Sequence, residues 1–144
     1  MKSIVKTSTL LVLLFSVFVG CSKKNRCSQI EESIQSIKIG SEFSLDTLNT
    51  AKWDTVYIME PYSYDVLDTL NIQNIPSGVK TSLKSRLGRD TYCALIFTEK
   101  LNYVNHAFIR RNIDFSWLEN IKYPADQIYY LAGNKRVSIP AKKN

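Results

Sequence analysis

Residues 92–98 have the sequence Tyr-Cys-Ala-Leu-Ile-Phe-Thr, an apolar run without the polar–apolar alternation of a half-exposed strand. A strand of this composition is covered on both faces, so the segment predicts an interior strand of a sheet. Glu99 and Lys100 are expected at the tip of a hairpin, and residues 103–110 return with partial alternation. This part of the chain therefore predicts two antiparallel strands, the first of them deep in the fold.

A second interior strand is predicted for residues 53–59, Trp-Asp-Thr-Val-Tyr-Ile-Met. The period of two along a strand places Trp53 and Tyr57 on one face and Val56 on the other. Because both faces are apolar, both have to be covered, and Trp53 is expected in the core.

Three short helices are expected beside these strands. Ser28 and Glu31 have the spacing of a capping box, and isoleucines at helical spacing follow as far as Gly40. Two further helices are predicted over residues 63–70 and 79–87, each with an apolar face. All three are short enough to need packing against the sheet.

A hairpin is predicted near the carboxyl end, where two β-prone runs, 127–132 and 135–139, are joined by Gly133-Asn134. The segment before it, 114–120, is expected to be irregular or helical, with Trp117 buried.

These elements together predict a single α+β domain over residues 28–140, with a largely antiparallel sheet of about five strands and about three short helices. Seven of the nineteen basic residues lie outside it, in residues 2–26 and in the basic tail, 141–144. The other twelve face thirteen acidic residues, so the domain has a formal charge of −1. A nearly neutral domain does not predict binding to nucleic acid, which depends on neutralising phosphates.

The first twenty residues have the organisation of an export signal, with two lysines followed by a ten-residue apolar segment. That segment is about half as long as a membrane-spanning helix requires. It ends in Phe18-Val19-Gly20-Cys21, which resembles the lipobox of bacterial lipoproteins, with phenylalanine in place of the usual leucine. The resemblance implies cleavage before Cys21 and attachment of lipid, palmitate included, to its thiol, so that residues 21–27 form a lipidated tether.

The residues after Cys21 indicate which membrane face the chain occupies. In Gram-negative lipoproteins an aspartate in the next position favours the inner membrane, so Ser22 implies transfer to the outer membrane. Lipoproteins exported to the surface of some envelopes have acidic residues here, whereas this chain has Lys23 and Lys24. We therefore expect a protein that faces the periplasm and whose acyl chains give stable attachment to the membrane.

The segment Trp53-Asp54-x-x-Tyr57-Ile58-x-x-Pro61-Tyr62 resembles one in small uncharacterised envelope lipoproteins of bacteria. The likeness covers about residues 43–110. It implies a similar fold and no catalytic residue, because that group has no assigned activity.

The sequence does not predict a metal or cofactor site. His106 is the single histidine, and no cysteine or histidine pair has the spacing of zinc ligands. We expect His106 to be a hydrogen-bonded structural residue on a strand. Ser77 and Lys80 have the serine–lysine spacing of penicillin-interacting enzymes, but the partner motifs of those enzymes are missing, so the spacing is interpreted as coincidence.

Glu60, Pro61 and Tyr62 are the candidate binding residues, because they leave a strand for a loop and loops carry function more often than cores do. The leading hypothesis is a non-enzymatic, periplasm-facing module that binds an envelope protein or a glycan. The alternative is a small glycan-directed enzyme or binder that uses the carboxylates near Glu60, since paired carboxylates hydrolyse glycosides and aromatic rings stack on sugars.

With Cys21 assigned to lipid, Cys27 and Cys93 remain in an oxidising compartment, where thiols tend to pair. A disulfide between them would close a long loop, worth roughly 4 kcal/mol. In the alternative, Cys93 is a small buried apolar residue, Cys27 belongs to the tether, and no bond forms. Both remain open, because a bridge requires Cα atoms within about 7 Å of each other.

Replacing Cys21 by alanine is expected to abolish both acyl labelling and removal of the signal, because that thiol is the predicted attachment point. Metabolic labelling with radioactive palmitate, together with the mass of the mature chain, measures both effects. Cys27→Ala is the matched control and should keep the label. A Cys21→Ala chain that is still labelled and shortened contradicts the lipobox assignment.

Overall fold

Strand β3 (Tyr92–Glu99) lies at the centre of the fold in the computed structural model, which describes residues 26–141. It pairs antiparallel with β4 (Asn102–Arg110) and with β2 (Thr55–Met59), and β5 (Lys122–Pro124) pairs with the outer side of β2. The strand order is β4-β3-β2-β5, so both predicted interior strands, β2 and β3, have a strand on each side.

The β3–β4 hairpin turns at Lys100 and Leu101, one residue later than the predicted tip. Both residues have positive φ, 49° and 69°, as a type I′ turn requires. The carboxylate of Asp54 supports this turn by accepting a hydrogen bond from the backbone N–H of Lys100, at 2.7 Å.

A second antiparallel sheet has the order β1-β6-β7, formed by β1 (Glu42–Ser44), β6 (Ile128–Leu131) and β7 (Val137–Ser138). The β6–β7 hairpin is the predicted one, but its turn is longer than two residues: Lys135 takes a positive φ of 61° and donates its backbone N–H to the Ala132 carbonyl. The single, largely antiparallel α+β domain is confirmed. Within residues 26–141 it has seven strands instead of about five, and the two that were not predicted are β1 and β5.

The α-helices within residues 26–141 are α2 (Arg26–Gln35), α3 (Leu45–Leu48) and α4 (Ser77–Leu87). Helix α2 begins two residues before Ser28, so the expected capping role of Ser28 is wrong, although the isoleucine stripe lies on this helix as predicted. The predicted helix over residues 63–70 is also wrong, since only a short 3₁₀ turn, η1 (Val66–Thr69), forms there.

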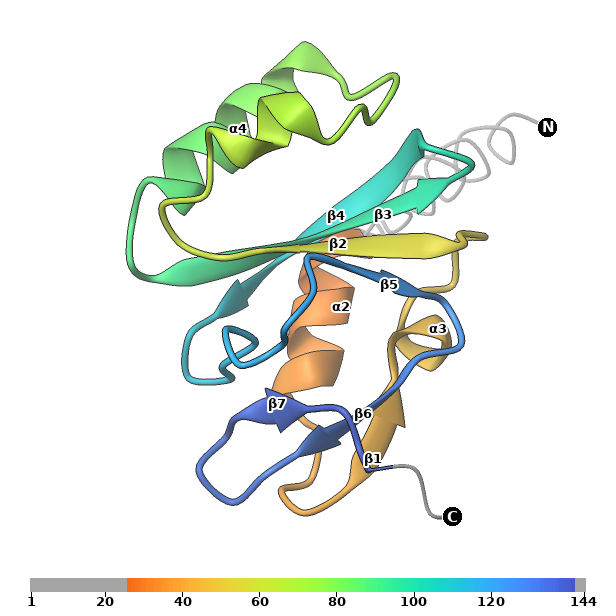
Figure 1. The fold of residues 1–144 in the computed structure, drawn as a ribbon, viewed down its shortest axis with the longest axis vertical. Coiled ribbons are helices and arrows are strands. Elements are labelled where there is room, and N and C mark those ends of the chain that lie inside the picture. Colours follow the sequence, from red (N-terminus) through yellow and green to blue (C-terminus); the bar gives the residue numbers. More distant parts are fainter. Residues whose placement is uncertain (1–25, 142–144) are drawn as a thin grey trace, which may run out of the picture.

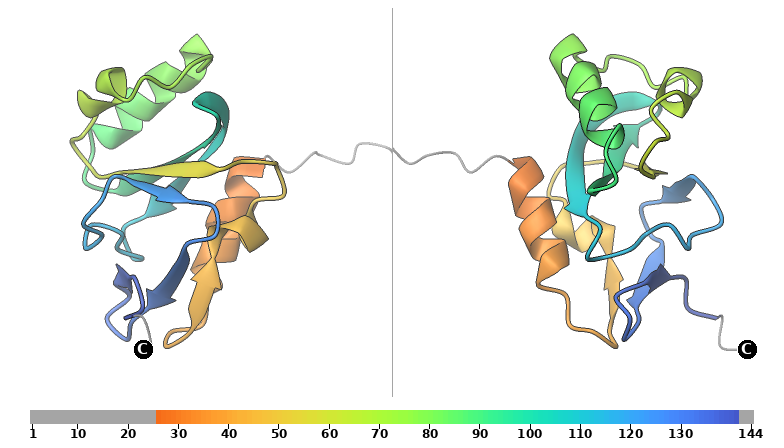
Figure 2. Two further views of the ribbon diagram at one scale, coloured as in Figure 1. Left: turned by 45° about the vertical axis from the view of Figure 1, so that its right-hand side comes forward. Right: turned by 90° about the vertical axis from the view of Figure 1, so that its left-hand side faces the viewer.

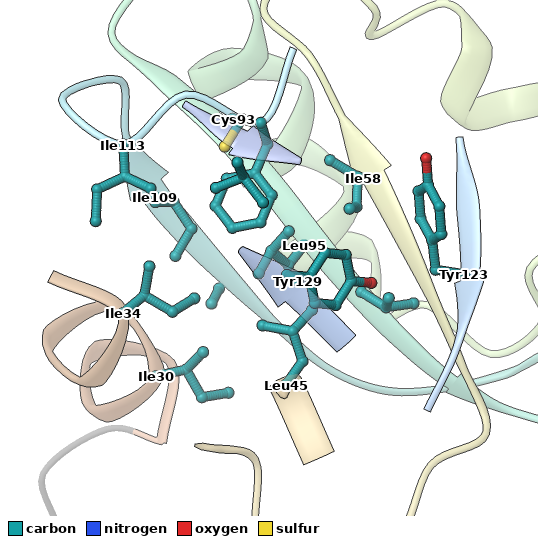
Figure 3. Packing of buried hydrophobic residues seen from close by; sticks show 14 of the residues in the cluster. Ile30, Ile34, Leu45, Ile58, Cys93, Leu95, Ile109, Ile113, Tyr123 and Tyr129 are labelled. Atoms are coloured by element: carbon teal, nitrogen blue, oxygen red, sulfur yellow. The ribbon is translucent and has the colours of Figure 1, made fainter. Parts of the chain in front are cut away.

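Two layers cover the two faces of the four-stranded sheet (Figure 1). Helix α4 and η1 lie on one face, and α2, α3 and the small sheet lie on the other, as both views of Figure 2 show. Ile30 and Ile34 of α2 are buried in the same cluster as Ile109 of β4 (Figure 3), while Leu83 and Leu87 of α4 fill the opposite layer. The edge strand β4 therefore has a helix beside each of its faces.

Trp53 is buried, as predicted, but it precedes β2 and packs in the same cluster as Val56 and Ile58. Tyr57 lies in the other cluster, so the predicted pairing of Trp53 and Tyr57 on one face is wrong. The indole meets the ring of Phe97 edge to face, with ring centres 4.9 Å apart. It therefore closes one end of the larger core.

Trp117 lies on the surface, which corrects the expectation that it is buried. Its side chain is 56% exposed, and the guanidinium of Arg136 stacks on its ring, 3.8 Å from the centre. The segment 114–120 is irregular, and the core positions in this region are Ile113 and Phe115.

Replacing Trp53 by alanine is expected to lower the free energy of unfolding by roughly 3–5 kcal/mol, the usual loss for a large aromatic side chain in a core. Trp53→Phe is the matched control. It keeps a ring and removes a buried indole N–H that has no hydrogen-bond partner among the described residues, so its cost should be much smaller. Urea unfolding followed by circular dichroism measures both, and an unchanged midpoint for Trp53→Ala contradicts the burial.

Candidate functional site

A cleft of about 380 Å³ opens beside the edge strand β4, between the two helices that cover its opposite faces. Helix α2 contributes Cys27 and Glu31, α4 contributes Ser82 and Arg86, and β4 contributes His106 and Phe108. We call this space the β4-edge cleft. It is the place in the described structure where a thiol, an imidazole and a guanidinium come together.

The packing of α2 against β4 carries Cys27 to His106. Ile30 and Ile34 anchor the helix in the core, and one turn earlier the Cys27 sulfur lies 4.0 Å from Nδ1 of His106. The hydroxyl of Tyr103 lies 2.7 Å from the same nitrogen. Burial raises the pKa of Tyr103 to about 12, so the phenol keeps its proton and forms a hydrogen bond with Nδ1. Which of the two groups donates depends on which ring nitrogen carries the imidazole proton.

His106 is neutral at physiological pH. Partial burial lowers its pKa below the ordinary value of 6.5, and the positive charge of Arg86 lowers it further. The imidazole is also packed edge to face against Phe108, with ring centres 5.1 Å apart. The expectation of a hydrogen-bonded histidine on a strand agrees with this environment, and the structure adds that the ring lines the cleft.

Arg86 is held in place by aromatic rings. Its guanidinium carbon lies 4.5 Å from the ring centre of Phe108 and 5.3 Å from that of Tyr92. Among the residues that the structure describes, no carboxylate lies within ion-pair distance of Arg86. Its charge is therefore available to the cleft.

The two lysines on the same helix have a different environment. Lys80 and Lys84 both contact the carboxylate of Asp68, at 2.7 and 2.6 Å. Their hydrogen bonds lower the pKa of Asp68 to about 2. Asp68 is one of the acids that lie near Glu60 in the sequence, and these contacts give it a surface ion-pair role.

A second cleft, of about 480 Å³, continues along α2 toward the end of β4. Glu31 borders both clefts, and its carboxylate lies 3.6 Å from Nε of Arg110. Farther along, the side-chain amides of Gln35 and Asn112 form two reciprocal hydrogen bonds, at 2.9 and 2.6 Å. These contacts fix the carboxyl-terminal half of α2 to the end of the edge strand β4.

Glu60, Pro61 and Tyr62 lie together in the loop after β2 and are not among the residues that line these two clefts. Tyr62 is 62% exposed and has a positive φ of 65°, which is an uncommon conformation for a tyrosine. Its backbone N–H donates to the Leu87 carbonyl at 2.6 Å, which holds the loop to the end of α4. An exposed aromatic ring in a strained conformation keeps this loop a binding candidate.

Cys27 and Cys93 are not bonded to each other in the structure. Cys27 is beside His106, whereas Cys93 pairs with Ile109, three residues along β4 and thus roughly 10 Å away along the strand. Cys93 is buried in the core, and burial raises the pKa of its thiol to about 12. This arrangement matches the alternative in which Cys93 is a small buried apolar residue.

Three features considered in the sequence analysis are the export signal, metal ligands and membrane-spanning segments. The export signal and Cys21 lie outside residues 26–141. Within the described part of the chain, no three histidine, cysteine or acidic side chains gather as metal ligands do. No helix in that part is long and apolar enough to cross a membrane.

Comparison with protein families finds no matching family model for this chain, and comparisons with curated proteins and with solved structures find no significant match. The function is therefore inferred from the residues of this chain.

The role of Arg86 in the cleft and the proximity of Cys27 to His106 were not predicted from the sequence. These three residues come from α2, α4 and β4, which are far apart along the chain. One local signal was available: Arg86 lies seven residues after Val79, on the same side of the helix, and Ser82 lies between them. A polar and cationic stripe beside an apolar stripe on a short helix indicates a face that borders solvent or a site.

The single histidine of the chain is expected to titrate below pH 6.5, which proton NMR of its ring measures directly. Arg86→Gln should raise this midpoint toward 6.5, because it removes a nearby positive charge, whereas Arg89→Gln should leave it unchanged. The unfolded chain binds the proton more readily, so the domain should lose stability as the pH falls from 6.5 through the lowered pKa. A midpoint at or above 6.5 contradicts the described environment.

Proposed function

We propose that this chain is a lipid-anchored binding module of the bacterial cell envelope, attached through Cys21 and facing the periplasm from the outer membrane. Its ligand site is the β4-edge cleft, and its partner is an envelope protein or a glycan. The observation that carries the assignment of the site is the meeting of Cys27, Arg86 and His106, from three separate elements, around one open cleft.

The contacts in the cleft favour binding over catalysis. The Cys27 sulfur and Nδ1 of His106 are 4.0 Å apart, which is at the outer limit for a hydrogen bond to sulfur. That nitrogen also shares a shorter hydrogen bond, of 2.7 Å, with the hydroxyl of Tyr103. The carboxylate that borders the cleft, Glu31, is close to Arg110 instead of facing a second acid.

The position of the cleft also supports an anchored binding module. Cys27 is in the first turn of α2, only six residues after the proposed lipid attachment point. An extended chain of six residues spans at most about 22 Å. A ligand in the cleft is therefore held close to the membrane surface to which the tether leads.

A second candidate is a glycan binder centred on Glu60, Pro61 and Tyr62. The exposure and positive φ of Tyr62 favour it, because strained, exposed aromatic residues cluster at binding sites. Neither the domain fold nor the anchor distinguishes the two candidates, so the test has to compare the two surfaces directly.

A photo-crosslinking residue placed at Ser82, at Tyr62 or at Gly133 compares the two surfaces and a control turn in intact cells. We expect a discrete crosslinked species from Ser82 and none from Gly133, which lies at the exposed tip of the β6–β7 turn. Adding Gly78→Leu should remove that species, because Gly78 lines the cleft and a Cβ added there meets no protein atom within 4 Å, so the new side chain can occupy the cleft. Crosslinks from Tyr62 alone would support the second candidate and overturn the proposed site.

A further inference from the structure

We infer that the β4-edge cleft binds an anionic group, a carboxylate or a phosphate, against the guanidinium of Arg86. This inference rests on the proposed function, in which the same cleft is the ligand site. It specifies the chemistry that the ligand presents, which the proposed function leaves open.

Aromatic rings hold the side chain of Arg86 in place, and no carboxylate among the described residues neutralises its charge. The rings of Phe108 and Tyr92 hold its guanidinium at 4.5 and 5.3 Å, so little side-chain entropy is lost when it binds. Several other cations of the domain are already engaged by acids, as Arg111 is by Asp90 and Lys52 by Glu99. A guanidinium offers a planar fork of N–H donors that fits the oxygens of a carboxylate or a phosphate.

The polar side chains that line the cleft next to Arg86, Ser82 and His106, are uncharged groups that form hydrogen bonds. Ser82 lies one turn before Arg86 on α4, and its hydroxyl can donate. His106 is uncharged at neutral pH and forms a hydrogen bond with Tyr103 through Nδ1. An anion beside Arg86 thus meets one full positive charge, the hydroxyl donor of Ser82 and an uncharged imidazole.

The acidic group in the cleft lies on the opposite wall. Glu31 belongs to α2, and its charge is partly balanced by Arg110, 3.6 Å away. Because Arg110 offsets Glu31, Arg86 is the charged group among the described residues lining the cleft that has no ion-pair partner. The volume of about 380 Å³ is within the usual range for small-molecule sites. The cleft therefore accommodates a small anion or the charged end of a larger ligand.

Cys27 provides a built-in reporter for this inference, because its sulfur lines the cleft. Iodoacetate and iodoacetamide alkylate a thiol by the same displacement: the sulfur–carbon bond forms, the carbon–iodine bond breaks, iodide leaves, and the thiol proton goes to the buffer. The two reagents differ in that only iodoacetate carries a carboxylate. The ratio of their rates at Cys27, divided by the ratio for N-acetylcysteine, measures how strongly the cleft attracts an anion.

The full chain, extracted from membranes in a non-ionic detergent, is treated with each reagent, and the modified cysteine is identified by peptide mass. We expect iodoacetate to be favoured at Cys27 by at least about threefold at low salt, since positive sites concentrate anions. The preference should approach one in about 1 M salt, where the screening length is about 3 Å. Arg86→Gln should remove it, and Arg89→Gln, which changes an exposed arginine just beyond the carboxyl end of the same helix, should not.

Competition identifies the source of the anion. Acetate and inorganic phosphate are added separately, with chloride at equal ionic strength as the control. Slowing by acetate alone assigns a carboxylate ligand, and slowing by phosphate alone assigns a phosphate ligand. If neither slows the iodoacetate reaction more than chloride does, no anion site exists and the inference is wrong.

Three other results would overturn the inference: a rate ratio equal to that of N-acetylcysteine, an equal loss of the ratio in Arg86→Gln and Arg89→Gln, or a Cys27 that reacts with neither reagent. Thermal unfolding of both variants shows that the comparison is made on folded protein. Crosslinks from Ser82 without an anion preference would leave the proposed function standing and reject only this inference. An anion preference without crosslinks would do the reverse.

Discussion

The structure depends on the burial of β3 on both of its faces. A strand that is apolar on both sides cannot border water, so the chain has to supply two covering layers. Helix α4 covers one face, and α2 with the small sheet covers the other. Because only β4 lies outside β3 on that side, both helices come close to its edge. The β4-edge cleft is the space that remains where the two layers meet.

The parts of the fold that could be predicted are those whose pattern is complete within one segment. Strands β2 and β3 are short apolar runs and helix α4 has apolar residues at helical spacing, so each of the three was predicted from its own segment. Strands β1 and β5 have three residues each, too few for a period, and they exist because partners far along the chain pair with them, as Phe43 does with Tyr129. Trp117 was wrongly predicted to be buried because the sequence does not show that Arg136 stacks on an exposed indole ring.

The candidate site was less accessible to sequence reasoning than the fold. His106 was noticed because it is the only histidine, but its neighbours come from two helices whose docking the sequence does not encode locally. The loop at Glu60 to Tyr62 was noticed because it is a single continuous segment. Residues that meet only through tertiary packing, such as Cys27 and Arg86, need the coordinates before they can be grouped.

Helix α2 also determines how the domain responds to mechanical force. It is the first element in the described part of the chain, and it forms one wall of the cleft. It is held to the sheet by the packing of side chains such as Ile30 and Ile34, with no ladder of backbone hydrogen bonds to β4. Tension between the amino end and the rest of the domain is therefore borne by the cleft wall before it reaches the strands. A ligand that contacts both walls would oppose the separation of α2 from the sheet. Tension that separates them would in turn weaken the binding of that ligand.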